Sequence, residues 1–278
     1  MPHQQGRPGW LGLRVCSILL AALASAASNI ASAAEDRCIA VAQAPRSRGI
    51  EPVRLRLAEV KAGEVRIAYV GHSTFLIESQ RGVKIATDYN DYVRPSVVPE
   101  IATMNRAHST HFTNFPDPQI RHVLRGWDPA GGAAQHDVTL EDVRVRNVPT
   151  NIRDWQGGTD LFGNSIFVFE MGTLCIAHLG HLHHTLTAQQ LAQIGQMDVV
   201  FVPVDGSYTL DLPGTLEVLR SLKAPLVIPM HYFSSFTLGR FLEAVRGDFE
   251  VKMNETPVIN VSRANLPPKP QVLVLPGS

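Results

Sequence analysis

The sequence contains few charged residues and few cysteines, and both features exclude some classes of protein and of binding site. Only 18% of its 278 residues are charged, and 25 Lys and Arg balance 25 Asp and Glu to a formal net charge of zero. A neutral chain gives no electrostatic case for binding nucleic acid or an anionic membrane surface. Of its three cysteines only Cys38 and Cys175 lie beyond the first 34 residues, too few for a cysteine-based zinc site there. The 45% of hydrophobic residues nevertheless suits a folded globular domain.

Long apolar runs are also missing, apart from one near the N-terminus. Arg7 and Arg14 precede an apolar run at 15–27, which is shorter than the roughly 20 residues of a membrane span. Small residues follow, with an A-x-A-like cleavage point at 31–34 just before Glu35. This layout predicts a signal peptide over 1–34 and export to the periplasm or the exterior, the alternative being an uncleaved N-terminal anchor. The remaining residues 35–278 are enough for one domain, with no stable membrane association.

Export implies an oxidising compartment in which two cysteines can pair. Cys38 and Cys175 are the cysteines outside the predicted signal peptide. They form either one disulfide or one mobile and one buried thiol. We favour the separate thiols.

The hydrophobic pattern predicts hairpin strands in the first half and alternating strands and helices in the second. No linker or repeat interrupts it, so we expect one α/β (α+β) domain with two sheets and flanking helices. A short helix is expected around 120–125, and the Pro-rich end from 266 is expected along the surface. The main predicted strands span 53–57, 65–70, 73–78, 83–87, 143–148, 165–169, 173–177, 199–204 and 225–230. The other predicted helices span 186–194, 212–222 and 238–245.

Six of the eleven histidines follow the predicted ends of strands or of short apolar stretches. Catalytic residues of open α/β folds gather on loops at one edge of a sheet, and neutral imidazole is a good ligand for zinc and similar metals. A single histidine after a strand is more often a hydrogen-bonded loop residue, but six such positions favour a metal site. His183 and His184 are expected at a pocket rim, whereas His122 and His136 have no such placement. The six are His72, His108, His111, His178, His181 and His231.

Four blocks of the sequence resemble the metallo-β-lactamase fold superfamily, especially its branch of predicted Zn-dependent hydrolases that includes sugar-phosphate lactonases. They follow the family's order over roughly 64–235 and imply a four-layer αββα sandwich with the site at one edge of its two sheets. The blocks are 69–78 with its G-H-S-T, 83–88 ending in Asp88, 178–181 reading H-L-G-H, and 227–232 containing His231.

One block departs from the family. The family's metal-binding loop reads H-x-H-x-D-H, whereas residues 106–111 read R-A-H-S-T-H. Arg106 and Thr110 therefore replace a histidine and an aspartate, and His181 replaces the family's bridging aspartate. The family's site holds two metal ions. These changes remove ligands of one ion, and the ligands that remain for the other ion are all imidazoles. The resemblance then implies one zinc ion, with iron or manganese as alternatives, held by His111, His181 and His231, with His108 or His178 as a further donor.

Such a site predicts a metal-dependent hydrolase, in which metal-bound hydroxide attacks an ester, lactone, amide or phosphoester of a small-molecule substrate. Asp88 is expected to orient a ligating histidine, and His72 or Asp205 to act as acid or base. Arg106 is expected to bind a substrate carboxylate or phosphate. The alternative is a catalytically inactive protein of the same fold that serves as a metal- or ligand-binding module. Trp155 is expected to pack in the core or at a rim.

Overall fold

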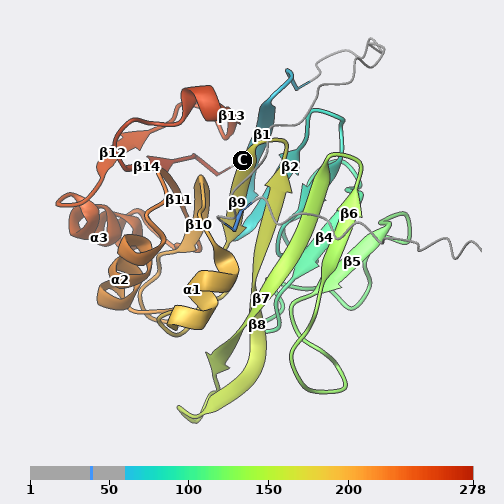
Figure 1. Cartoon of the computed structure of the whole chain (residues 1–278). Helices are drawn as coiled ribbons and strands as arrows, with labels where there is room; N and C mark the ends of the chain where they lie inside the picture. Colours follow the sequence, from blue (N-terminus) through green and yellow to red (C-terminus); the bar gives the residue numbers. More distant parts are fainter. Residues whose placement is uncertain (1–37, 40–59, 278) are drawn as a thin grey trace, which may run out of the picture. The chain divides into compact units, whose positions relative to one another are not determined.

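The computed structural model describes residues 38–39 and 60–277, all of which belong to one compact unit, Asp36–Ser278. Two β-sheets make up most of this unit (Figure 1). The predicted signal peptide and the strand predicted at 53–57 lie outside the described residues.

The first sheet has six strands in the order β13-β1-β2-β3-β4-β5. Its first part is a meander of antiparallel pairs, and β3, β4 and β5 then run parallel. The strands are β1 (Glu64–Gly71), β2 (Thr74–Glu78), β3 (Lys84–Ala86), β4 (Ile101–Met104), β5 (His122–Arg125) and β13 (Val258–Ser262).

The second sheet has eight strands in the order β12-β14-β11-β10-β9-β8-β7-β6. The strands from β9 to β12 in this order are parallel, so their C-terminal ends meet at one edge. The strands are β6 (Asp137–Leu140), β7 (Val143–Arg153), β8 (Thr159–Met171), β9 (Leu174–His178), β10 (Val199–Pro203), β11 (Leu226–Met230), β12 (Glu250–Met253) and β14 (Gln271–Val274).

The main core lies between the two sheets, where Phe75 of β2 stacks on Phe201 of β10 with ring centroids 4.1 Å apart. Three helices cover the other face of the eight-stranded sheet (Figure 1). Asp211 begins the second of them as predicted, because its side chain accepts a hydrogen bond from the Gly214 amide. The helices are α1 (Ala188–Ile194), α2 (Leu212–Leu222) and α3 (Ser235–Val245), and the α/β class is confirmed.

Loops, rather than helices, cover the outer face of the six-stranded sheet among the described residues. Ile85 and Ile101 face the central core, whereas Ala86 and Ala102 face outward and pack with loop side chains such as Trp127. No helix in the described part of the chain has the length and apolarity to cross a membrane.

Two element predictions are wrong. The short helix expected around 120–125 is strand β5, which pairs in parallel with β4. The end expected along the surface contains β14, which lies between β11 and β12 with Val272 fully buried. Both strands have only four residues, so their period-two pattern is too short to identify, and their pairing partners supply the stability.

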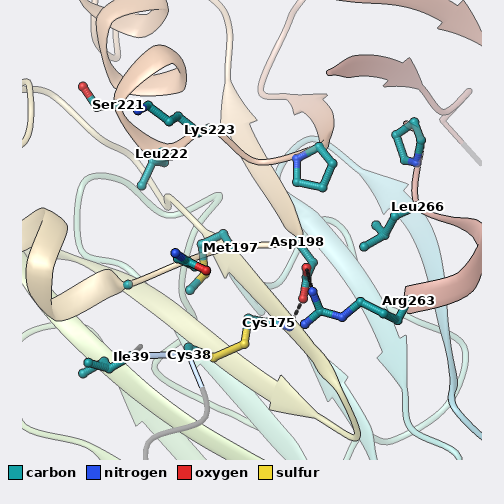
Figure 2. A pocket seen from close by; sticks show the side chains of 14 residues that line it. Cys38, Ile39, Cys175, Met197, Asp198, Ser221, Leu222, Lys223, Arg263 and Leu266 are labelled. Carbon is teal, nitrogen blue, oxygen red and sulfur yellow. Dashed lines mark hydrogen bonds and ion pairs between the residues drawn. A yellow bond between two sulfur atoms is a disulfide. The ribbon is translucent and has the colours of Figure 1, made fainter. Parts of the chain in front are cut away.

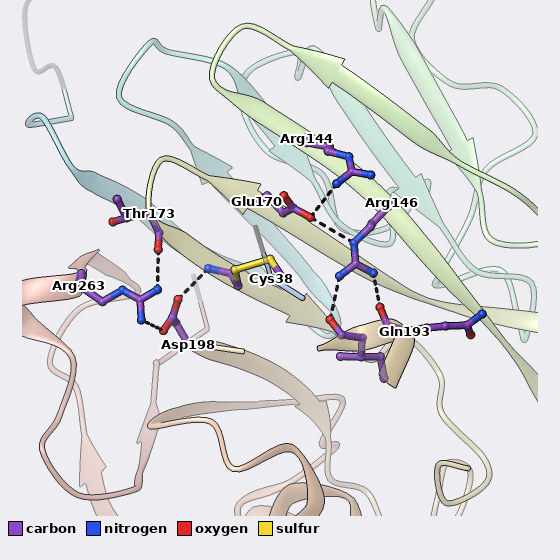
Figure 3. Close-up of a disulfide and its surroundings, with 10 residues drawn as sticks. Cys38, Arg144, Arg146, Glu170, Thr173, Gln193, Asp198 and Arg263 are labelled. Carbon is purple, nitrogen blue, oxygen red and sulfur yellow. Dashed lines mark hydrogen bonds and ion pairs between the residues drawn. A yellow bond between two sulfur atoms is a disulfide. The ribbon is translucent and has the colours of Figure 1, made fainter. Parts of the chain in front are cut away.

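The two cysteines form a disulfide, so the prediction of separate thiols is wrong. Cys38 and Cys175 are 137 residues apart in sequence, and only the fold brings their Cα atoms to 5.8 Å. The Gln196 amide donates to the Cys38 carbonyl at 2.9 Å, which also holds residue 38 beside the segment between α1 and β10. Figure 3 shows the bond beside the ion pair of Asp198 and Arg263.

A cavity of 840 Å³ lies beside this disulfide and is lined by Asp198, Lys223 and Arg263 among others (Figure 2). Most of its lining residues precede or begin β9, β10, β11 or β14, so it lies at the N-terminal edge of these parallel strands. The histidines follow the opposite ends of the strands, and the cavity is therefore separate from them.

Candidate metal centre

Four histidines converge at the C-terminal edge of the strands. His108 and His111 lie in the loop after β4, His181 follows β9, and His231 directly follows β11. Each offers one ring nitrogen, and these four atoms lie within 4.8 Å of one another. His111, His181 and His231 are buried, whereas His108 is partly exposed. Nitrogens that bind one zinc ion, each at about 2.0–2.1 Å from it, also lie only a few ångströms from one another.

Two of these histidines are backed by carboxylates. Nδ1 of His111 lies 2.5 Å from Oδ2 of Asp88, and Nδ1 of His231 lies 3.0 Å from Oδ2 of Asp205. Nε2 of both rings is buried and has no hydrogen-bond partner. A carboxylate behind the ring is the usual support for a metal-ligating histidine, and an unpartnered buried nitrogen is costly unless something binds it. These two atoms therefore fit a metal ion.

The other two histidines contact each other. The Arg153 amide donates to Nδ1 of His183 at 2.7 Å, so a neutral His183 carries its proton on Nε2 and donates to Nδ1 of His181 at 2.5 Å. The proton of a neutral His181 is then on Nε2, which lies 2.9 Å from Nε2 of His108. An ion that takes these two nitrogens as ligands must displace that proton.

Burial sets the charge of the group. It lowers the pKa of His111 and His181 well below the usual value, and neighbouring imidazoles lower it further, so both rings are neutral at neutral pH. Burial alone would raise the pKa of Asp205, but hydrogen bonds from His231, Thr209 and the Ser207 amide bring it below its usual range. Burial raises the pKa of Asp88, against a hydrogen bond from Asn105. The rings of His111 and His181 are thus uncharged, as metal binding requires.

His72 lies beside this group. Its Nε2 is 3.0 Å from Oγ1 of Thr110, which is itself 2.7 Å from Nδ1 of His108. Its ring centroid is 4.3 Å from that of His231. Burial, followed by the charge of His231, lowers the pKa of His72 to about 4. His72 is therefore neutral, with its Nε2 facing the Thr110 hydroxyl at the edge of the site.

The backbone is strained where these side chains enter the site. His72, Asp88 and His231 have φ of 53°, 42° and 54°, a left-handed region that non-glycine residues seldom adopt. Gly180 has φ of 62°, and a Cβ there would lie 2.4 Å from the side chains of Asn105 and Asn164. Only glycine fits between His178 and His181 in this turn.

Two residues predicted for the site have other partners. His178 donates from Nε2 to the Ser73 carbonyl at 2.9 Å and accepts the Gly180 amide at Nδ1 at 3.2 Å, so neither nitrogen is left for a metal. Arg106 is ion-paired with Asp160 of β8, which neutralises the charge expected to bind a substrate anion.

Asp205→Asn is expected to weaken metal binding by about 10- to 100-fold, because the amide is a poorer acceptor for Nδ1 of His231. Competition with a fluorescent chelator measures this change. The matched control is Asp211→Asn at the start of α2, where asparagine also caps a helix and affinity is expected to stay the same. Equal affinities for both variants would contradict the role of Asp205.

His183, expected only at a pocket rim, contacts His181 and is the contact that the sequence failed to predict. Its signal was the two-residue spacing from His181, which puts both rings on one side of an extended loop. We expect His183→Ala to strengthen metal binding, because a neutral His181 can then carry its proton on Nδ1 and leave Nε2 free for the ion. His184→Ala serves as the control, because Nε2 of His184 has no hydrogen-bond partner. A change in His184→Ala as large as in His183→Ala would refute the assignment.

This fold and its histidine group define a metallo-β-lactamase type of site. Residues 66–231 match the model of the Beta-lactamase superfamily domain, and the chain belongs to that family. It is 32% identical over 193 residues to a UPF0173 metal-dependent hydrolase of Thermoplasma volcanium, covering 61% of this chain and 84% of the relative. A second UPF0173 metal-dependent hydrolase, from Methanoculleus marisnigri, is 24% identical over 67% of this chain and 89% of its own length. With these relatives the chain is placed among the metal-dependent hydrolases of the superfamily.

Solved structures support the same fold. A protein of Thermotoga maritima assigned as a Zn-dependent hydrolase of the metallo-β-lactamase superfamily superposes with a TM-score of 0.57 at 27% identity, over 77% of this chain and 100% of its own. Igni18, a metallo hydrolase of Ignicoccus hospitalis, superposes with a TM-score of 0.51 at 18% identity, over 77% of this chain and 97% of its own. At 18% identity, the similarity to Igni18 shows the fold alone.

Proposed function

We propose that the chain is an exported hydrolase whose metal site holds one zinc-type ion on Nε2 of His108, His111, His181 and His231. The observation that carries this proposal is the pair of buried, unpartnered Nε2 atoms of His111 and His231, each with a carboxylate behind its ring. The printed names of the relatives, metal-dependent hydrolases, support it. Imidazole nitrogen is a donor that zinc prefers, with iron and manganese as alternatives.

A bound divalent ion would lower the pKa of a water molecule to about 7 and polarise the substrate's carbonyl or phosphoryl oxygen. Asp88 and Asp205 hold the rings of His111 and His231 with Nε2 toward the site. Thr110 occupies the position of the family's aspartate and links His108 to His72. The neutral His72 accepts a proton at Nε2 through the Thr110 hydroxyl.

The candidate substrates are carboxyl esters, lactones, amides and phosphoesters. Because Arg106 is paired with Asp160, we favour neutral esters and lactones over phosphoesters. The test assays the purified protein on a panel of these four classes, before and after chelation and after addition of zinc. We expect turnover of an ester or lactone that is lost on chelation and restored by zinc. Undiminished turnover by the metal-free protein would reject the proposal.

Export is supported by the charged and apolar pattern of the N-terminus and by the disulfide between Cys38 and Cys175, which suits an oxidising compartment. Fractionation of expressing cells with N-terminal sequencing tests it. We expect a mature chain that begins at Glu35 in the exported fraction. An uncleaved chain inside the cell would exclude export by this signal.

A further inference from the structure

The exposed aromatic side chains of the described residues gather at the edge that carries the histidines. Each lies in a loop after the C-terminal end of a strand, in the first turn of α3 shortly after β11, or at the tip of the β7–β8 hairpin, which extends past that edge because Phe167 pairs with His178. Exposed apolar residues are ordinary when scattered, but a group beside a site indicates binding. The six are Tyr92, Phe115, Trp155, Tyr208, Phe233 and Phe236. Trp155 is 91% exposed, so its expected packing in the core or at a rim is wrong.

One of these aromatics adjoins the histidine group, and a second packs against it. The ring of Phe233 lies 5.3 Å from that of His231 and 5.9 Å from that of His72, measured between centroids. Tyr208 meets Phe233 edge-on at 5.6 Å. Phe233 is nevertheless 58% exposed and Tyr208 66% exposed, so both rings keep an open surface.

The loop that carries Tyr208 is anchored. Nη2 of Arg153, the last residue of β7, donates to the carbonyl oxygens of Ser207, Tyr208 and Thr209 at 3.1, 3.3 and 2.6 Å. Asp205 accepts the amides of the same loop while it holds His231. Tyr208 is therefore positioned by the same contacts that position a metal-site histidine, and a rigid aromatic ring binds at little entropic cost.

The two arginines near this edge already have partners within the protein. Arg153 is bound to backbone carbonyls, and Arg106 is ion-paired with Asp160. Both guanidinium groups are thus already bonded within the protein, whereas the two exposed rings offer apolar area. The surface beside the histidines thus suits a neutral substrate with a hydrophobic group.

We propose that Tyr208 and Phe233 form an apolar wall that binds the hydrophobic acyl group of a neutral carboxyl ester, with the ester carbonyl toward the histidine group. The inference rests on the proposed metal-dependent hydrolase activity and specifies its substrate class. Each methylene that the wall covers raises affinity by up to about fourfold. Lengthening an acyl group from four to eight carbons adds four methylenes, so even about twofold for each of them, half of the full effect, strengthens binding at least about tenfold.

The test measures kcat/KM of the zinc-loaded protein on p-nitrophenyl esters from acetate to octanoate. We expect the value to rise at least about tenfold from butanoate to octanoate. Phe233→Ala is expected to remove most of this rise, because the truncation removes the contact with the acyl chain. Phe236→Ala is the control, because this ring is 74% exposed but contacts none of the histidine rings.

A binding measurement separates failure of this inference from failure of the proposed activity. Calorimetry compares octanoate with butanoate on the same proteins, and we expect octanoate to bind at least about tenfold more tightly except in Phe233→Ala. That result would support the wall even if no ester were hydrolysed. Ester turnover without dependence on acyl length, or equal losses in Phe233→Ala and Phe236→Ala, would overturn it. A length preference seen only with phosphatidylcholine vesicles would also overturn it and assign the aromatics to a membrane surface.

Discussion

His231→Ala is expected to leave the purified protein with almost no zinc and to lower kcat/KM by about a thousandfold or more, because the ion contributes several kcal/mol of transition-state stabilisation. Nε2 of His231 is buried without a partner, and Asp205 holds its ring in place, so no other side chain can replace this ligand. Elemental analysis and the ester assay on the same preparation measure both effects.

The matched control is His178→Ala, which removes a histidine that is equally buried and lies in the same part of the site. Both nitrogens of His178 are bonded to the backbone, so this variant is expected to lose stability but to keep its zinc per folded molecule. Loss of zinc from His178→Ala with retention in His231→Ala would reverse the assignment of ligands.

Cys175→Ser is expected to lower the free energy of unfolding by about 2–5 kcal/mol, since a disulfide across 137 residues removes much loop-closure entropy from the unfolded chain. For a domain of this size the Tm should fall by roughly 5–15 °C. Thermal unfolding with and without a reductant measures the change.

The double variant Cys38→Ser/Cys175→Ser is the control for the reductant. It should unfold at the same temperature as the single variant, and dithiothreitol should lower the Tm of the wild type alone. A wild-type Tm that does not respond to complete reduction would contradict a stabilising role for the disulfide.

The regular parts of the fold could be predicted because their patterns are long or strongly apolar. The buried run of β10 and the capped helix α2 are examples, and both lie within a residue of their expected bounds. Strands β5 and β14 could not be predicted, because each is a four-residue segment stabilised by neighbours distant in sequence. The disulfide could not be predicted for the same reason, because the distance between its cysteines is a property of the fold.

Convergence of the histidines could be predicted from their places after strands, since such ends meet at one edge of the sandwich. The sequence could not predict which of these rings turns toward the site. His178 is held by the carbonyl of Ser73, 105 residues away, and His183 is turned toward His181 by the amide of Arg153. Likewise, nothing in the sequence near Arg106 indicates that Asp160 neutralises it.

Anomalous diffraction from crystals of the zinc-loaded protein tests the central claim most directly. We predict one anomalous peak per chain, bound by Nε2 of His108, His111, His181 and His231, with Asp88 and Asp205 behind two of the rings. Two peaks, or a single peak bound by His178, would contradict this account.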